Sequence, residues 1–204
     1  MDARQAVNQN PTGEPAFFFA GPSQTLLAVD SGEAVVGIAR ERGQLLRSVE
    51  RVLRERDRSS VLVGAVPFSD EAPVRLFCPN QVTRAGRWGA SETAAAPRRE
   101  IGLEANAVGR PLGPEEKHFV AAVADATRAI REGSLEKVVL SRAMNVELGA
   151  PPALAPLLRL LRTRNPHGFT FALGLGARSG GGAKVTLVGA SPELLLSRRG
   201  LRVV

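Results

Sequence analysis

Cysteine and long hydrophobic runs are scarce in this chain of 204 residues. Its one cysteine, Cys78, cannot form an internal disulfide, which is typical of proteins in a reducing compartment. No apolar run approaches the roughly 20 residues needed to span a bilayer, and the polar N-terminus leads into no apolar signal core. We therefore expect a cytoplasmic protein with no membrane partner. With one cysteine, and with His118 and His167 lacking metal-ligand spacing, a zinc site is not expected.

Tyrosine is absent, aromatic residues make up 4% of the chain, and lysine accounts for only Lys117, Lys137 and Lys184 among 27 basic residues. Stacking platforms for single-stranded nucleic acid need aromatic side chains, so their scarcity counts against such a site despite the net charge of +7. The densest basic stretch, residues 40–58, interleaves its arginines with glutamate and aspartate, which is typical of a solvated helix face. No nucleic-acid partner is expected, and the arginine excess fits a GC-rich genome at least as well.

The hydrophobic residues, 44% of the chain, are enough to build a core, and their spacing predicts alternating elements. Strands are predicted at 17–19, 25–29, 61–66, 74–77, 137–148, 169–175, 185–188 and 194–197. Helices are predicted at 38–58, 114–133 and 152–164, the second with Phe119, Val123 and Ile130 facing inward and Gly133 ending it. This order predicts an α+β fold with α/β-type layers. We expect a loose N-terminus at 1–15, a single domain over 16–204 and a mobile connection at 84–100.

Two ionisable side chains lie in apolar, strand-like stretches, where a charge is costly to bury. Partial burial of Lys137 would favour its neutral amine, which can act as a general base. Glu193 follows Ser191-Pro192, and burial of its carboxyl group beside leucines would keep it protonated and able to act as a general acid. The alternatives are a lysine that reaches water from a strand edge and a surface glutamate paired with Arg198 or Arg199. The residues alone leave both alternatives open.

Several ordered motifs resemble one enzyme family. Lys-Val-Val-Leu-Ser-Arg at 137–142 and Gly-Ala-Ser-Pro-Glu-Leu-Leu-Leu at 189–196 resemble two signature strands of the chorismate-utilising enzymes, and residues 165–173 fit the stretch between them. Upstream, residues 17–22 and 63–68 resemble the isochorismate synthase branch, especially the siderophore type that feeds dihydroxybenzoate. The resemblance implies a chorismate-binding fold in which large antiparallel sheets are flanked by helices.

The resemblance also implies a reaction. These enzymes hold chorismate in a deep cleft with Mg²⁺, add a nucleophile at C2 of the ring and release the C4 hydroxyl. Lys137 matches the lysine that activates water, and Glu193 matches the glutamate that protonates the leaving hydroxyl. A lysine at this position favours water over ammonia as the nucleophile. A salicylate synthase, which keeps the lysine and then eliminates pyruvate, stays an alternative, as does a truncated, non-catalytic Arg-rich domain.

Family members are about twice as long as this chain, so the resemblance implies a fold truncated to about its first half. The acidic residues that hold Mg²⁺, and most groups that bind the substrate carboxylates, are then expected beyond Val204, with no metal ligand within the chain. The chain is expected to turn at 198–200 and to end as a partner strand begins. We therefore expect an N-terminal portion of an isochorismate synthase with an incomplete site. A monomer is the expected oligomeric state.

Overall fold

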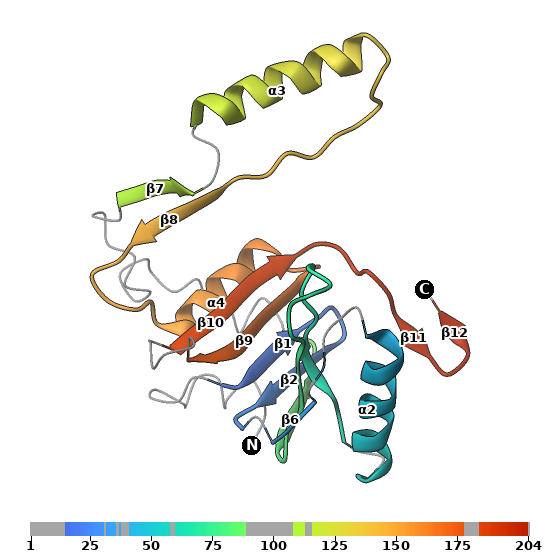
Figure 1. Cartoon of the computed structure of the whole chain (residues 1–204). Coiled ribbons are helices and arrows are strands. Elements are labelled where there is room, and N and C mark those ends of the chain that lie inside the picture. The colour runs from blue at the N-terminus through green and yellow to red at the C-terminus, as the bar shows by residue number, and fades with distance from the viewer. Residues whose placement is uncertain are drawn as a thin grey trace. The chain divides into compact units, whose positions relative to one another are not determined.

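The computed structural model describes residues 15–30, 32–35, 37, 41–57, 60–88, 108–112, 116–177 and 184–203. The chain divides into two compact units, and Figure 1 shows the elements of both. The first unit is formed by Met1–Ala96 with Leu154–Val204, and the second by Pro97–Ala153. The predicted loose terminus at 1–15 lies outside the described residues except for Pro15. That residues 16–204 form one chorismate-binding domain stays a prediction.

An antiparallel sheet of five strands forms the centre of the first unit, in the order β10-β9-β1-β2-β6. Its strands are β1 (Phe17–Ala20), β2 (Gln24–Ala28), β6 (Val82–Gly86), β9 (Phe169–Ala177) and β10 (Lys184–Ser191). The strands predicted at 17–19, 25–29, 169–175 and 185–188 are confirmed. Because β1 lies between β2 and β9, the start of the chain is held against its last third.

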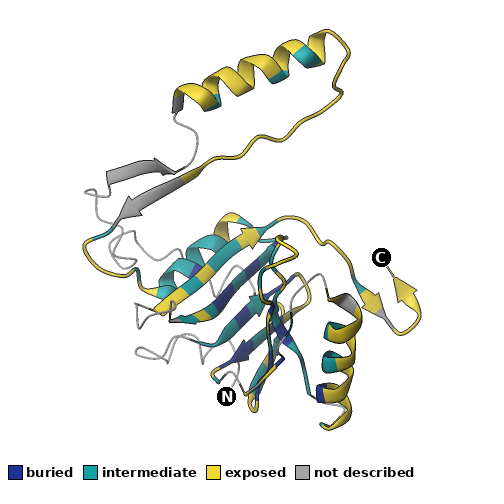
Figure 2. Ribbon diagram, viewed as in Figure 1, coloured by how far each residue is buried: buried dark blue, intermediate teal, exposed yellow. Residues whose placement is uncertain are grey.

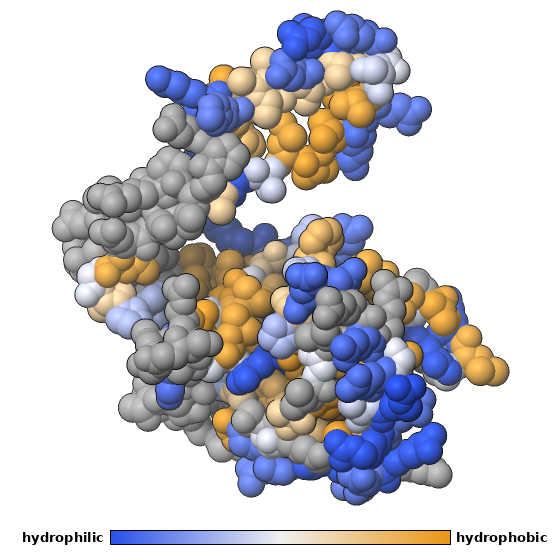
Figure 3. All heavy atoms as spheres, in the orientation of Figure 1, coloured by the Kyte–Doolittle hydropathy of each residue, from blue (hydrophilic) through white to orange (hydrophobic). Residues whose placement is uncertain are grey.

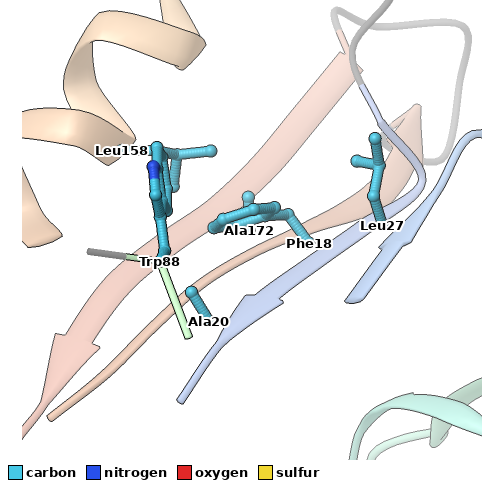
Figure 4. Packing of buried hydrophobic residues seen from close by; sticks show 6 residues of the cluster. All are labelled: Phe18, Ala20, Leu27, Trp88, Leu158 and Ala172. Carbon is cyan, nitrogen blue, oxygen red and sulfur yellow. The ribbon is translucent and has the colours of Figure 1, made fainter. Parts of the chain in front are cut away.

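One face of this sheet is covered by α4 (Leu154–Arg164), which packs on β9 and β10. The helix ends where predicted because Pro166 disfavours a helical backbone at Asn165. Figure 4 shows the core between helix and sheet, which consists of Phe18, Ala20, Leu27, Trp88, Leu158 and Ala172. The Phe18 and Trp88 rings meet edge to face with centroids 5.4 Å apart. Such a pair contributes about 0.5–1.5 kcal/mol beyond its burial.

A smaller sheet, in the order β3-β5-β4, and α2 (Arg42–Arg54) complete the first unit. The strands are β3 (Glu33–Val35), β4 (Val63–Ala65) and β5 (Arg75–Cys78). Val52 of α2 and Cys78 are fully buried in one cluster with Val35, so Cys78 is a small residue of the core. Phe77 is buried with Leu173 of β9, so the smaller sheet packs against part of the five-stranded sheet.

The outer face of α2 carries the interleaved charges that the sequence predicts. Arg51 pairs with Glu55 at 3.2 Å, and Arg54 pairs with Glu50 at 3.4 Å, both one helical turn apart. Exposed pairs of this kind contribute only about 0.3–0.5 kcal/mol each. The solvated helix face is therefore confirmed.

Among the residues that the structure describes, none of the helices has the length and the hydropathy that a membrane span requires.

The mobile connection predicted over 84–100 can be compared with the structure only at residues 84–88. Arg84 lies in β6, where it pairs with Leu26 of β2, and Trp88 is only 2% exposed because its indole fills the main core. The prediction is therefore wrong for residues 84–88, since strand pairing and burial order them. Residues 89–100 lie outside the described part of the chain.

The last predicted strand, 194–197, is also wrong. Pro192 follows the end of β10, and residues 193–197 have no regular secondary structure. A short hairpin forms instead from β11 (Arg198–Arg199) and β12 (Arg202–Val203). Gly200 adopts a φ of 60° between these strands, a conformation that glycine adopts without strain. The expected turn and partner strand thus exist, but the first strand starts four residues later than predicted.

The second unit contains α3 (Glu116–Arg131) and a ribbon of β7 (Val108–Leu112) with β8 (Ala143–Glu147). The helix is confirmed, and Gly133 with a φ of 75° follows its end, as predicted. The expected inward face is wrong, since Val123 and Ile130 are 42% and 41% exposed. Figure 2 shows α3 as largely exposed. One helix and a two-stranded ribbon offer too little surface to bury these side chains.

Candidate active site

Lys137 lies in the second unit, between α3 and β8, in a segment without regular secondary structure. Every residue from 131 to 143 is exposed, and Val139, two residues after the lysine, is 80% exposed. The predicted strand over 137–148 is therefore confirmed only for β8, Ala143–Glu147. The expected burial of Lys137 is therefore wrong for this structure.

The pairing of β8 explains why the strand starts late. Its partner β7 ends at Leu112, which is opposite Ala143, and no described residue pairs with the segment before it. A strand without a neighbour leaves its backbone groups to water. At the end of that segment the Arg142 guanidinium lies over the Phe119 ring of α3, 5.8 Å from its centroid. This cation–π contact fixes the end of the lysine segment against the helix.

Glu193 lies in the first unit, two residues after β10 ends. The Ser191 hydroxyl accepts a hydrogen bond from the Glu193 amide at 3.2 Å and donates one to the Glu193 carbonyl oxygen at 3.2 Å. These two bonds close a tight turn around Pro192. Ser191 thus holds the backbone of Glu193 in this turn, and neither of the two hydrogen bonds uses the Glu193 carboxyl group.

The expected burial of Glu193 beside leucines is wrong for this structure. Glu193 is exposed, and Leu195 is 98% exposed because no described strand continues from β10. The alternative of a surface glutamate agrees with this exposure, whereas Arg198 donates from Nε to the Gly200 carbonyl oxygen at 2.9 Å. The side chain of Arg199, the other proposed partner, lies outside the described residues. Lys137 and Glu193 belong to different units. Their meeting across a cleft stays a prediction.

A buried arginine supports the backbone near Glu193. Arg162 of α4 is 2% exposed, and it donates to the carbonyl oxygens of Gly168 at 2.8 Å and Gly21 at 3.4 Å. Burial lowers the pKa of the Arg162 guanidinium below its ordinary value, and the positive charge of Arg87 lowers it further. The arginine remains charged at neutral pH and ties the turn after β1 to the loop before β9.

The sequence analysis missed Arg162. Leu154, Leu158 and Arg162 follow one another at four-residue spacing, which places them on one face of α4. An arginine in an apolar helical stripe is the signal that could have found it. The Nε of Arg162 and the hydroxyl of Thr170 are buried without a hydrogen-bond partner among the described residues.

Gly168 connects Arg162 to the Ser-Pro-Glu turn, because its carbonyl oxygen accepts the Arg162 hydrogen bond and its Cα packs closely against Ser191. A Cβ at this position would lie 2.5 Å from the Ser191 carbonyl oxygen and would also overlap the Asn165 side-chain amide. We expect Gly168→Ala to lower the free energy of unfolding by about 1–3 kcal/mol, because the backbone before Glu193 has to move. Gly86→Ala is the matched control, since a Cβ there meets nothing within 4 Å. Urea titration of both variants measures the difference, and equal midpoints would contradict this packing.

Gly189 of the second motif has a similar role beneath an aromatic ring. It lies opposite Phe171 in the pairing of β10 with β9, and a Cβ at Gly189 would lie 2.5 Å from Cζ of that ring. The glycine therefore lets the ring lie across the strand. The motif at 189–196 thus contains a glycine that the Phe171 ring requires, in addition to Glu193, the candidate acid.

No group of three or more His, Cys, Asp or Glu residues in the described part of the chain could hold a metal ion. His118 on α3 and His167 in the turn before β9 are both exposed. The described side chains therefore do not fit a Mg²⁺ site.

Comparison with known proteins decides the family. The model of the chorismate binding enzyme family matches residues 50–204, a range that includes both Lys137 and Glu193. The chain belongs to this family. Its match to the chorismate-binding enzymes confirms the resemblance seen in the motifs, and the observed antiparallel sheets flanked by helices are consistent with the expected fold.

Relatives of this chorismate-binding chain include curated isochorismate synthases. It is 31% identical to isochorismate synthase DhbC of Bacillus subtilis over 93% of the chain and 48% of that protein. It is 34% identical to isochorismate synthase EntC of Escherichia coli over 71% of the chain and 35% of that protein. A crystal structure of DhbC from Bacillus anthracis, assigned as a 2,3-dihydroxybenzoate-specific isochorismate synthase, aligns with a TM-score of 0.74 at 29% identity. That alignment covers 98% of this chain and 50% of the solved one.

The chain thus spans about half the length of the DhbC relatives it matches, and less of EntC. This agrees with the expectation that family members are about twice as long.

Proposed function

We propose that this chain forms part of an enzyme that converts chorismate to isochorismate. The similarity to curated isochorismate synthases over nearly the whole chain supports the proposal most strongly. By "the complete enzyme" we mean this chain together with a polypeptide that corresponds to the part of those relatives it does not match. Lys137 is the proposed general base, and Glu193 the proposed general acid.

The reaction balances with these two groups. Lys137 takes a proton from water as the water oxygen bonds to C2 of the ring. The ring double bonds shift from C1–C2 and C5–C6 to C6–C1 and C4–C5 as the bond from C4 to its hydroxyl breaks. Glu193 gives that hydroxyl a proton, so that it leaves as water. One water enters and one leaves, and the product is an isomer of chorismate. Proton transfers of this kind contribute typically about 10²–10⁴-fold to a rate.

Lys137 and Glu193 are exposed in this structure, so their proposed roles require that other residues bury them. A lysine acts as a base at neutral pH when its surroundings disfavour the ammonium form, and an acid in the same site must hold its proton. The described residues leave both Lys137 and Glu193 open to water. The remainder of the complete enzyme is therefore proposed to bury them and to supply the carboxylates that hold Mg²⁺. Once bound, Mg²⁺ would neutralise the substrate carboxylate.

The siderophore or 2,3-dihydroxybenzoate branch is the proposed pathway, and relatives named for vibriobactin and for 2,3-dihydroxybenzoate support it. A cytoplasmic location belongs to the same proposal. The proposed reaction does not depend on the pathway or on the location.

The function is tested by supplying chorismate and Mg²⁺ to this chain coexpressed with the unmatched part of Bacillus subtilis DhbC. Chromatography of the products is expected to show isochorismate. Release of pyruvate with salicylate would favour the salicylate synthase alternative. If the correctly assembled pair formed neither product, the proposed function would be wrong.

A further inference from the structure

Arg162 breaks the apolar pattern of the helix that carries it. Leu154 and Leu158 precede it at four-residue spacing, and a third leucine would continue that face of α4 without burying a charge. The arginine at this position is only 2% exposed, and its Nε has no hydrogen-bond partner among the described residues. A buried donor without a partner destabilises the fold. Sequences depart from their local pattern at such a cost chiefly at functional sites.

The Arg162 guanidinium holds the end of two paired strands. β1 and β9 pair as far as Ala20 with Thr170. Gly21 follows the last residue of β1, and Gly168 directly precedes β9. The guanidinium donates to the carbonyl oxygens of both glycines, at 3.4 Å and 2.8 Å. Arginine suits this task because its donors form a rigid planar fork, whereas lysine offers a single ammonium group.

Gly168 is also where this loop meets the residues before Glu193. Ser191 pairs with Phe169 at the end of β10, and its carbonyl oxygen lies 2.5 Å from the position that a Cβ on Gly168 would occupy. The Ser191 hydroxyl in turn bonds to the amide and to the carbonyl oxygen of Glu193. A continuous set of contacts therefore runs from the Arg162 guanidinium through these two residues to Glu193.

The residues after Glu193 provide no comparable anchor in the described part of the chain. Residues 193–197 have no regular secondary structure, and Leu195 is 98% exposed. In the β11–β12 hairpin that follows, Leu201 is 97% exposed, and Figure 3 shows hydrophobic side chains at the surface there. Within this structure the backbone of Glu193 is therefore held by the residues before it.

We infer that Arg162 is a positioning residue for the proposed acid, because it fixes through Gly168 the turn that carries Glu193. This inference rests on the proposed function, since it takes Glu193 as the acid. Proton transfer requires the donor to lie within hydrogen-bond reach of the leaving oxygen, so a displaced acid lowers the rate. A purely structural arginine would stabilise the first unit as a whole and would have no specific effect on the acid.

The first test measures hydrogen exchange in this chain. In Arg162→Met, the amides of residues 189–193 are expected to exchange at least about fivefold faster, because the loop before β9 loses a hydrogen bond. The amides of β5, in the smaller sheet, are expected to stay within about twofold of the parent rates. Arg164→Met is the matched control, since Arg164 is an exposed arginine of the same helix. Equal acceleration in both segments, or none at 189–193, would overturn the inference.

A second variant and a probe of folding accompany this test. Trp88, the one tryptophan, is buried in the main core, and its fluorescence reports whether each variant is folded. Arg162→Lys keeps the charge but lacks the planar fork that binds two carbonyl groups. It is expected to accelerate exchange at 189–193 less than methionine does, and it replaces Arg162→Met if that variant does not fold.

The second test measures kcat and KM for chorismate in the complete enzyme. Arg162→Met is expected to lower kcat at least about tenfold and to change KM less than about threefold, because a displaced acid affects the transition state more than the bound substrate. Combining Arg162→Met with Glu193→Gln is expected to be no more than about twofold slower than Glu193→Gln alone, since a residue that acts through the acid has no effect once the acid is gone. Arg164→Met is expected to leave kcat within about twofold of the parent value. Losses that multiply in the double variant would overturn the inference.

The two measurements separate the positioning role from the proposed function. If the assembled enzyme made no isochorismate while Arg162→Met accelerated exchange only at 189–193, the proposed function would be wrong and the hold of Arg162 on the turn would stand. If Glu193→Gln kept full turnover, the acid role would be wrong, and the positioning role of Arg162 would be wrong with it.

Discussion

Lys137→Ala in the complete enzyme is expected to lower kcat by about 10²–10⁴-fold with little change in KM for chorismate. The reason is that alanine removes the proposed base, which acts on water in the transition state and contributes little to holding the substrate. Steady-state assays of isochorismate formation measure both constants. The lysine segment is exposed and irregular, so the substitution disturbs no packing in the described structure.

The matched control is Lys117→Ala. Lys117 is also an exposed lysine of the second unit, at the start of α3, and its loss is expected to leave kcat within about twofold of the parent enzyme. Full turnover by the Lys137 variant would refute the base role. Equal losses in both variants would point to a general effect of positive charge.

Glu193→Gln is expected to lower kcat by about 10²–10⁴-fold, because an amide of the same shape cannot supply the proton that the leaving hydroxyl needs. The free energy of unfolding of the Glu193→Gln variant is expected to equal that of the parent enzyme. The two hydrogen bonds that form the turn use the Ser191 hydroxyl and the backbone of Glu193, and the substitution leaves both intact. Thermal unfolding of the variant therefore separates loss of chemistry from loss of structure.

Glu41→Gln is the control for this variant. Glu41 is exposed before α2, and its side chain makes no capping hydrogen bond. Its replacement is expected to leave kcat within about twofold of the parent value. If Glu193→Gln retained full turnover while the control also did, the acid would have to come from another part of the complete enzyme.

The two catalytic proposals share one structural condition. Lys137 and Glu193 are each exposed within their own unit. A surrounding low in water is what makes a lysine a base and a glutamate an acid near neutral pH. The base and acid roles are therefore proposed for the complete enzyme.

Elements with a strong local pattern could be predicted from the sequence. The leucine spacing of α4 and the stop at Asn165-Pro166 specify that helix, and Gly133 marks the end of α3. The charges of α2 pair one turn apart as the sequence suggests. The signature motifs alone led to the family that the comparison confirms.

Burial could not be predicted in the same way, because it depends on neighbours that are distant in the chain. Lys137 lies in an apolar run that predicts a strand, yet β7 ends at Leu112, and no described strand pairs with the run before Ala143. Arg162 is charged and was overlooked, although its hydrogen bond to Gly21 joins positions 141 residues apart. A sequence pattern shows which side chains are apolar, but it does not show which residues bury them.

The amino-acid sequence by itself therefore determined the family, the positions of most helices and strands, and the two candidate catalytic residues. The tertiary structure alone decided that β1 lies between β2 and β9, and that Arg162 supports the backbone near the Ser-Pro-Glu turn. The physical reason is that local conformation follows from neighbouring residues, whereas strand order, hydrogen-bond partners and desolvation arise from contacts between distant ones.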